Sequence, residues 1–228
     1  GSSYYRILSV NDSLSLAYEE EFKYGIYQLG FKRFFRYLNY VRIVRFESQN
    51  YSRFDECQVV SSVDAFYLNS LNTQINTSVH NIGVDHLFFR PVLKENMTLD
   101  EDVLLIVGNL IGGNLQYTQN FIDSVWSRYI EKHRDHKLKI VSRTLPNHWS
   151  EEFVIDNNLE ILNDVESLPE VYQTCSAVIS PVLKKCGMQN KILEGMSMGK
   201  VVIGYEPSFL GISYGNNGCE YLAAKNSG

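Results

Sequence analysis

The chain has 228 residues, of which 44% are hydrophobic and 21% charged, and its formal net charge is −5. This acidic balance gives no electrostatic reason to expect a nucleic-acid partner, and no apolar run approaches the roughly 20 residues that a membrane-spanning helix needs. The four cysteines show neither CxxC spacing nor the density of a disulfide-rich scaffold. Free thiols in a reducing, cytoplasmic compartment are therefore expected.

Strand-like and helix-like stretches alternate over the first ninety residues, which predicts an α/β arrangement. The Asn-Asp-Ser turn at residues 11–13 follows an apolar run and supplies the N-cap chemistry that starts a helix. Ser61 or Ser62 is expected to cap a second helix over residues 63–71. The expected strands are residues 4–10, 59–60 and 75–82.

Residues 22–46 contain six basic residues, nine aromatic residues and no acidic residue. Five apolar residues in this stretch recur at helical spacing: Phe31, Phe34, Phe35, Leu38 and Val41. The spacing predicts an amphipathic helix with a basic side. Two interpretations stay open. The aromatic stripe either faces the core while the arginines reach water, or it forms a peripheral contact with an anionic surface on the inner face of a membrane.

The second half of the chain continues the pattern of strand followed by helix. Val103–Val107 is a continuous apolar run, as expected for a parallel strand covered on both faces. The glycine-rich turn after it, with Gly108 and Asn109, could bring the backbone close to a phosphate. Arg143 follows the next strand, where it either reaches a phosphate or is an ordinary surface residue. Further strands are expected at 138–141, Leu159–Leu162, 177–179, 201–203 and 219–224, and helices at 121–133, Leu168–Thr174 and 189–198.

Residues 177–203 read as strand, loop, helix and strand, a βαβ unit whose loop ends at a helix N-terminus. Unpaired N–H groups and the helix dipole make such a point suited to a phosphate or carboxylate. Gly199 is expected to end the helix with a positive φ. At 100° per residue, Ile192, Leu193 and Met196 share one side of the helix, and three polar residues share the other: Asn190, Lys191 and Glu194. The polar side either reads a nucleotide or is only a solvated helix surface.

This stretch resembles the donor-binding segment of GT-B glycosyltransferases of the retaining, family 4 type, the glycosyl transferases group 1. The usual segment is a glycine loop followed by K-x-L-E-A-M-A-x-G-x-P-V-V. Seven positions match it: Lys191, Leu193, Glu194, Met196, Gly199, Val201 and Val202. VNDSLSLAY (10–18) and NIGVDHLFFRP (81–91) are similar to segments within and at the end of the N-terminal domain of this family.

The resemblance implies two Rossmann-like domains of parallel strands with flanking helices. A partial acceptor-side domain would occupy residues 1–92 and a nucleotide-sugar donor-binding domain residues 93–228, joined by a linker within 92–102. The first strands of the acceptor-side domain and the last helices of the family fold are expected to lie outside this chain. A chain without those parts need not be active by itself.

The resemblance also implies an activity, namely sugar transfer from a nucleoside diphosphate to a hydroxyl of a carbohydrate or lipid-linked acceptor, in polysaccharide or glycolipid synthesis. Glu194 would hydrogen-bond the donor ribose, the amides of residues 187–189 would face the diphosphate, and the backbone of residues 163–165 would recognise the base. The predicted donor-binding residues are Gly108, Asn109, Arg143, Val165, Gly187, Met188, Gln189, Asn190, Lys191 and Glu194. No residue is assigned as catalytic. No metal or cofactor is expected besides the nucleotide sugar, because His133 and His136 lack a third ligand in the sequence.

Two positions depart from the family pattern. Much of the family has a second glutamate eight positions before the ribose-binding one, and here that position is Cys186. A thiol cannot replace a carboxylate as an acceptor for sugar hydroxyls. The glycine-rich loop also lacks the family's basic residues, which leaves Lys184, Lys185 or Lys191 to neutralise a diphosphate. These departures favour an alternative role as a degenerate nucleotide-sugar-binding subunit.

Overall fold

The computed structural model describes residues 4–23, 31–92, 102–212 and 215–225. The chain divides into two compact units, and each is described by itself. Unit 1 consists of Gly1–Ile82, Leu183–Met188 and Pro207–Ser213, and unit 2 of Gly83–Val182, Gln189–Glu206 and Tyr214–Gly228. Most of the expected linker, residues 93–101, lies outside the described residues.

The described residues of unit 1 form a three-stranded parallel sheet in the order β1-β2-β3 and three α-helices. The chain order is β1 (Ile7–Asn11), α1 (Leu14–Lys23), α2 (Phe31–Asn50), β2 (Glu56–Val59), α3 (Ser62–Leu71) and β3 (Thr77–Val79). Ser61 caps α3 by accepting a hydrogen bond from the Asp64 N–H, which confirms one of the two expected caps. A small core forms between the sheet and α3, from Cys57, Val59, Ala65, Leu68 and Ile75.

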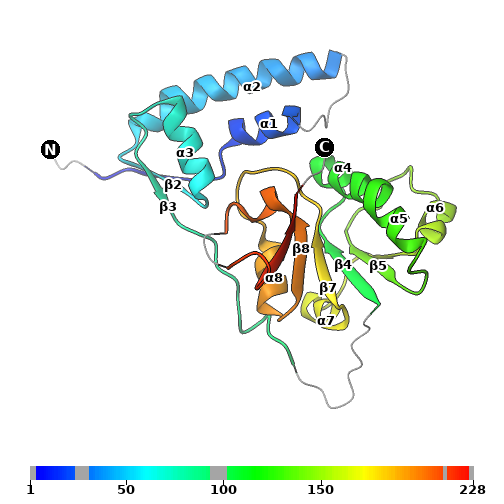
Figure 1. Cartoon of the computed structure of the whole chain (residues 1–228). Coiled ribbons are helices and arrows are strands. Elements are labelled where there is room, and N and C mark those ends of the chain that lie inside the picture. Colours follow the sequence, from blue (N-terminus) through cyan, green and yellow to red (C-terminus); the bar gives the residue numbers. More distant parts are fainter. Residues whose placement is uncertain (1–3, 24–30, 93–101, 213–214, 226–228) are drawn as a thin grey trace. The chain divides into compact units, whose positions relative to one another are not determined.

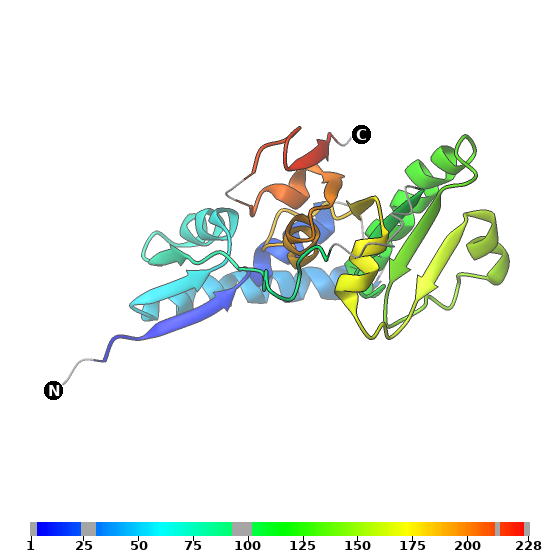
Figure 2. The same ribbon diagram turned by 90° about the horizontal axis from the view of Figure 1, so that it is seen from below.

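Helix α2 is the longest helix of the described structure and stands out in both views (Figures 1 and 2). Its aromatic stripe does not face a core, because Phe31 is 78% exposed and Phe34 and Phe35 are also exposed. Arg36 turns inward instead, where it pairs with Glu21 and lies over the Tyr18 ring, 4.6 Å from its centroid. The interpretation of a core-facing stripe with solvated arginines is therefore wrong for this part of the helix.

Unit 2 contains a six-stranded parallel sheet in the order β6-β5-β4-β7-β8-β9, with helices flanking the strands (Figure 1). The strands are β4 (Val103–Val107), β5 (Lys137–Val141), β6 (Leu159–Leu162), β7 (Ala177–Ser180), β8 (Val201–Tyr205) and β9 (Tyr221–Ala224). The helices are α4 (Gly112–Phe121), α5 (Ser127–Ile130), α6 (Glu151–Asp156), α7 (Leu168–Thr174) and α8 (Asn190–Ser197). All six expected strands of this half are present, although several boundaries shift by one or two residues. The prediction of an α/β fold with parallel sheets is confirmed.

Helix boundaries around the glycine-rich turn differ from the expected ones. The predicted helix over residues 121–133 starts nine residues earlier, at Gly112, and reaches Ile130 through a π-helical segment, Ile122–Trp126. Glycine has no side chain that favours a helix, so local composition gave no signal for this start. Burial of Ile122 and Trp126 in the core of unit 2 holds the helix in place. Helix α6 was not expected, although Ser150 caps it by accepting from the Phe153 N–H.

Helix α8 ends at the predicted glycine. Gly199 has a φ of +66°, and the N–H groups of Gly199 and Lys200 donate to Met196 and Gly195, which satisfies carbonyls of the last turn. Gly195 packs this helix against two strands, because a Cβ there would lie 3.2 Å from the side chains of Val178 and Val202. The helix is therefore seated closely on β7 and β8.

A buried carboxylate joins two helices of unit 1. Glu47 of α2 is 1% exposed, and its Oε1 accepts from the Leu14 N–H at 2.9 Å at the start of α1. Its Oε2 accepts from the hydroxyls of Ser13, at 3.1 Å, and Ser15. The N-terminal donors of α1 are thus satisfied by a charge from another helix, which also complements the helix dipole.

Replacing this carboxylate is expected to destabilise the protein. Glu47→Ala leaves buried hydroxyl and N–H donors without an acceptor, so the free energy of unfolding should fall by about 2–4 kcal/mol. Urea denaturation followed by circular dichroism measures the change. Gln49→Ala, on the exposed side of the same helix, is the control and should be near neutral. Equal stability of the two variants would contradict the role given to Glu47.

Candidate functional site

A pocket of about 820 Å³ lies in unit 2 at the carboxyl ends of β4, β5 and β6. Ligands of open α/β sheets bind at this edge. Six of the ten predicted donor-binding residues line the pocket: Gly108, Asn109, Arg143, Val165, Asn190 and Glu194. Its other lining residues are Val107, Val141, Ser142, Asp164 and Leu168. The structure therefore brings together residues that lie up to 87 positions apart in the chain, from Val107 to Glu194.

Helix α8 sorts its side chains as its spacing predicts. Ile192 and Leu193 are 0% and 3% exposed, which fixes the rotation of the helix about its axis. Asn190 and Glu194 line the pocket on the polar side. Lys191 belongs to the same end of the helix, since its Nζ lies 3.3 Å from the position that a Cβ at residue 108 would take. The polar side thus faces the carboxyl edge of the sheet, as the sequence predicts.

The loop after β4 is held by polar side chains. Ser142 Oγ accepts from the Leu110 N–H at 3.0 Å, and Asn109 Oδ1 accepts from the Arg143 N–H at 3.2 Å. Gly108 has a φ of +153° and donates its N–H to Val141 at 3.0 Å. Asn109 therefore shapes the pocket wall through its side-chain oxygen, whereas the exposed Arg143 offers its guanidinium to solvent. Ser142 also accepts from the Thr144 N–H at 3.2 Å and donates to the Thr144 carbonyl at 2.7 Å.

The turn after β6 forms another part of the wall. Asp164 has a φ of +48°, a left-handed conformation that aspartate tolerates better than most residues. It lines the pocket together with Val165, the residue expected to face a base. The pocket wall thus contains carboxylates from two elements, Asp164 and Glu194, and a guanidinium from Arg143.

Tyr172 of α7 is a site residue that the sequence analysis did not single out. It is fully buried, and its hydroxyl donates to Glu194 Oε2 at 2.8 Å. Burial and the neighbouring Glu194 carboxylate raise the pKa of Tyr172, so the phenol stays protonated. Its helix was predicted correctly, but a tyrosine on the apolar side of a short helix is indistinguishable from core packing in one sequence.

Two of the predicted donor-binding residues just before α8 lie outside the pocket of unit 2. Gly187 and Met188 are part of unit 1 and do not line the pocket. The Gly187 N–H donates to Asp64 Oδ2 at 2.8 Å, and Met188 Sδ accepts from the Ile82 N–H at 3.4 Å. The expectation that the Gly187 amide is offered to a diphosphate is therefore not met in this structure. Gln189 is the N-cap of α8, and its side chain makes no capping hydrogen bond.

Cys186, which stands where the family usually has a glutamate, is buried in unit 1. Burial, reinforced by the carboxylates of Asp64, Asp12 and Glu20, raises the pKa of its thiol to about 12, although Lys184 acts in the opposite direction. A protonated, buried thiol is neither a sugar-hydroxyl acceptor nor a nucleophile. Lys184 and Lys185 also belong to unit 1. The predicted cationic side chains that unit 2 places at the pocket are Lys191 and Arg143.

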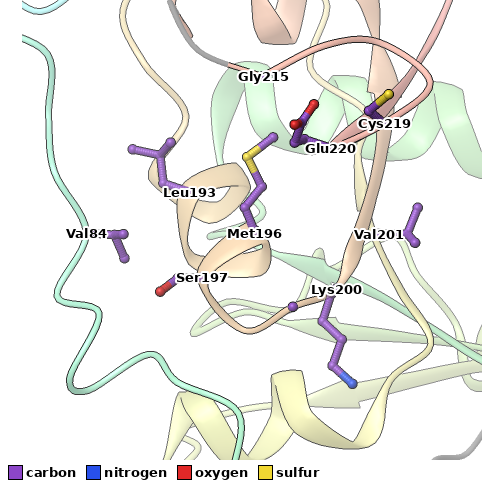
Figure 3. A pocket seen from close by; sticks show the side chains of 10 residues that line it. Val84, Leu193, Met196, Ser197, Lys200, Val201, Gly215, Cys219 and Glu220 are labelled. Carbon is purple, nitrogen blue, oxygen red and sulfur yellow. The ribbon is translucent and has the colours of Figure 1, made fainter.

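A second pocket of about 670 Å³ lies at the carboxyl end of α8 (Figure 3). Leu193 and Met196 give it apolar walls, and its polar side chains already have partners. Lys200 Nζ donates to the Gln173 carbonyl at 2.9 Å, Ser197 Oγ donates to Phe89, and Glu220 accepts from the Asn216 N–H. Fewer charged groups are therefore available to a ligand in this pocket than in the pocket at the carboxyl ends of β4 to β6.

One group of side chains in the described structure could place three metal-ligand atoms within 4.8 Å of one another: Asp102, Asp135 and His136. Asp102 and His136 each precede a strand, so the group lies at the amino edge of the sheet, away from the predicted site. His136 Nε2 lies 3.3 Å from Asp102 Oδ1, and Nδ1 lies 2.9 Å from the Tyr129 hydroxyl. These contacts explain the group as a local hydrogen-bonded cluster.

Comparison with known proteins identifies the family. The sequence model of the family described as glycosyl transferases group 1 matches residues 101–227, more than half of the chain. The chain belongs to this family. No curated protein matches the sequence.

Solved structures show the same fold at low sequence identity. Sucrose-phosphate synthase from Thermosynechococcus elongatus has a TM-score of 0.67 and 15% identity, and the match covers 92% of this chain and 52% of that one. WaaG, a glycosyltransferase involved in lipopolysaccharide biosynthesis, has a TM-score of 0.61 and 13% identity, with 90% and 57% covered. HepE from Anabaena, in complex with UDP and glucose, has a TM-score of 0.59 and 12% identity, with 96% and 57% covered. The chain thus spans little more than half the length of these proteins, and the fold is of the GT-B type.

Adding a methyl group at the edge of the pocket is expected to be costly. Gly108→Ala combines an unfavourable φ with a Cβ only 3.3 Å from Lys191 Nζ, so the free energy of unfolding should fall by about 1–2 kcal/mol. Gly83→Ala is the control, because its Cβ would meet nothing within 4 Å. Urea denaturation of both variants measures the difference. If Gly108→Ala were as stable as Gly83→Ala, the backbone conformation given for the loop would be wrong.

Proposed function

We propose that this protein transfers a sugar from a nucleoside diphosphate to an acceptor hydroxyl, as a retaining, family 4-like enzyme of polysaccharide or glycolipid synthesis. One observation carries the proposal, namely that the polar side of α8 meets the glycine loop of β4 at the carboxyl edge of the sheet. Family membership supports it, as does the HepE neighbour, whose structure contains UDP and glucose.

The chemistry needs a leaving diphosphate to be stabilised. The bond from the anomeric carbon to the β-phosphate oxygen breaks, the acceptor oxygen bonds to that carbon, and the proton of the acceptor hydroxyl passes to the departing diphosphate. Lys191, Arg143 and the N-terminal amides of α8 would offset the charge that develops on the diphosphate. Glu194 would accept hydrogen bonds from the ribose, and the backbone at Val165 would face the base. No metal enters the proposed reaction, and no residue is named as catalytic.

The three predicted residues just before α8 also belong to the proposal. Gln189 lies in unit 2, whereas Met188 and Gly187 belong to unit 1. The Gly187 amide would face the diphosphate only after leaving its hydrogen bond to Asp64. The division into an acceptor-side part (1–92) and a donor-binding part (93–228) also belongs to the proposal. The donor would bind to the second part, which contains the whole of the pocket described above.

Two substitutions on α8 test the donor site. Glu194→Ala and Lys191→Ala should each weaken nucleoside diphosphate binding about tenfold to a hundredfold, because a hydrogen bond to a charged group contributes about 1.5–3 kcal/mol. Isothermal titration calorimetry with UDP, GDP, ADP, CDP and TDP gives the affinities. Glu152→Ala and Lys132→Ala, both at exposed positions of unit 2, are the matched controls. Unchanged affinity in both α8 variants would remove the site assignment.

A second candidate function is a degenerate nucleotide-sugar-binding subunit. The buried, protonated Cys186 in place of a glutamate favours it. Release of the nucleoside diphosphate from a panel of nucleotide sugars separates the two, because binding without turnover supports the subunit and turnover supports the enzyme.

Helix α2 has a surface that suits contact with a membrane, which is where a lipid-linked acceptor would be found. No helix in the described part of the chain combines the length and apolar character needed to cross a bilayer. The exposed Phe31, Phe34 and Phe35 nevertheless lie next to the exposed Arg33. Aromatic and basic groups together bind anionic interfaces. We propose that the protein is cytoplasmic and contacts the inner face of a membrane through residues 22–46, of which 24–30 lie outside the described residues.

Vesicle sedimentation tests the membrane contact. The protein should sediment with anionic vesicles at low salt, and the double variant Phe34→Ser, Phe35→Ser should bind about fivefold or more weakly because it loses apolar area. Binding should also weaken at high salt, which screens the arginines. Phe66→Ser is the control, since Phe66 is 78% exposed on α3. Absence of binding at low salt would end the membrane proposal.

A further inference from the structure

Tyr172 connects helices α7 and α8 next to the candidate site. It lies on α7 with 0% exposure, and the Phe89 ring packs edge-on against it at 6.0 Å between centroids. Its hydroxyl is 2.8 Å from Glu194 Oε2 and 3.4 Å from the Lys191 carbonyl oxygen. A phenol has one proton to donate, and the shorter contact to a charged acceptor is the stronger hydrogen bond. The ring is fixed by packing, so the hydroxyl is fixed as well.

This contact constrains the carboxylate of Glu194. A free glutamate side chain has several rotamers and loses conformational entropy when it is ordered. The hydrogen bond from Tyr172 orders the side chain during folding and leaves Oε1 and the second lone pair of Oε2 as acceptors. Glu194 is half-buried and lines the pocket. A ligand that hydrogen-bonds this carboxylate therefore meets an acceptor that is already oriented.

We propose that Tyr172 is a positioning residue that orients Glu194 for a vicinal diol, and that the pair sets the preference of the pocket for ribonucleotides over deoxyribonucleotides. This inference rests on the proposed donor site. A pocket built to hydrogen-bond a hydroxyl rejects an analogue without that hydroxyl, because its polar group is then left unpaired. The Tyr172 and Glu194 pair gives that selectivity a physical origin in this chain.

A purely structural role for Tyr172 makes a different prediction. If the hydroxyl only holds α7 against α8, its removal weakens every ligand of the pocket by the same factor. If it orients Glu194 for the ribose, its removal weakens only ligands that carry the diol. The ratio of the two affinities therefore separates the roles.

The experiment compares ribose and dideoxyribose ligands by calorimetry. The probes are the ribonucleoside diphosphate that binds tightest among UDP, GDP, ADP and CDP, and its 2′,3′-dideoxy counterpart. The natural chain should prefer the ribose form at least tenfold. Tyr172→Phe, which keeps the ring packed against Phe89, should reduce affinity for the ribose form threefold to tenfold and leave the dideoxy affinity unchanged. Tyr129→Phe is the control, because that hydroxyl contacts His136 at the other edge of the sheet.

Each outcome separates the inference from the proposed function. An equal loss for both ligands, or no loss for either, would overturn the positioning role while leaving the donor site intact. A natural chain that binds both forms equally would show that Glu194 does not read the ribose, which also overturns the inference. Absence of binding by any nucleoside diphosphate would overturn the proposed function and the inference with it.

A measurement on the natural chain guards against a Tyr172→Phe variant that does not fold. In protein labelled with ¹³C at the tyrosine Cζ atoms, the Tyr172 signal should shift when the ribose form binds and stay in place with the dideoxy form. Identical shifts with the two ligands would contradict the proposal.

Discussion

The structure depends on the seating of one short helix. Ile192 and Leu193 of α8 are buried. Gly195 lies so close to β7 and β8 that a Cβ there would be only 3.2 Å from the side chains of Val178 and Val202. The helix can therefore neither rotate nor lift from the sheet without loss of packing. The positions of Asn190 and Glu194 follow from that constraint, because burial of the apolar side leaves both residues on the side that lines the pocket.

Charge in the pocket comes from three places in the chain: the loop after β5, the turn after β6 and helix α8. Arg143 follows β5, Lys191 lies in α8, Asp164 follows β6, and Glu194 is tied to Tyr172 of α7. Two cations and two carboxylates leave little net charge for a diphosphate, so the proposed binding would also need backbone amides and the helix dipole. The glycine loop suits this task, because its backbone is held by Ser142 and Asn109 and carries no side chain at Gly108.

The sequence alone predicted the elements whose signals are local. The apolar run Val103–Val107, the end of α8 at Gly199 and the split of α8 into two sides all appear in the structure. The start of α4 at Gly112 was missed, because tertiary burial of Trp126 and Ile122 outweighs the low helix propensity of glycine. The exposed Phe31 and Phe34 of α2 were open to two interpretations, since spacing predicts a stripe but not what covers it.

The candidate site was less accessible to sequence reasoning than the fold. Matching positions pointed to Glu194 and Lys191, yet nothing in one sequence links Tyr172 to a residue 22 positions away. The contact of Gly187 with Asp64 was equally invisible, because its partners lie 123 positions apart. Long-range hydrogen bonds of this kind decide which amides and carboxylates a ligand meets.

Mapping of a bound nucleotide on the protein tests the central claim most directly. In ¹H–¹⁵N correlation spectra recorded with increasing nucleoside diphosphate, the largest shift changes should fall on Gly108, Val165 and Asn190, around the pocket at the carboxyl ends of β4 to β6. Changes centred instead on Met196, Cys219 and Glu220, around the pocket at the other end of α8, would contradict the account.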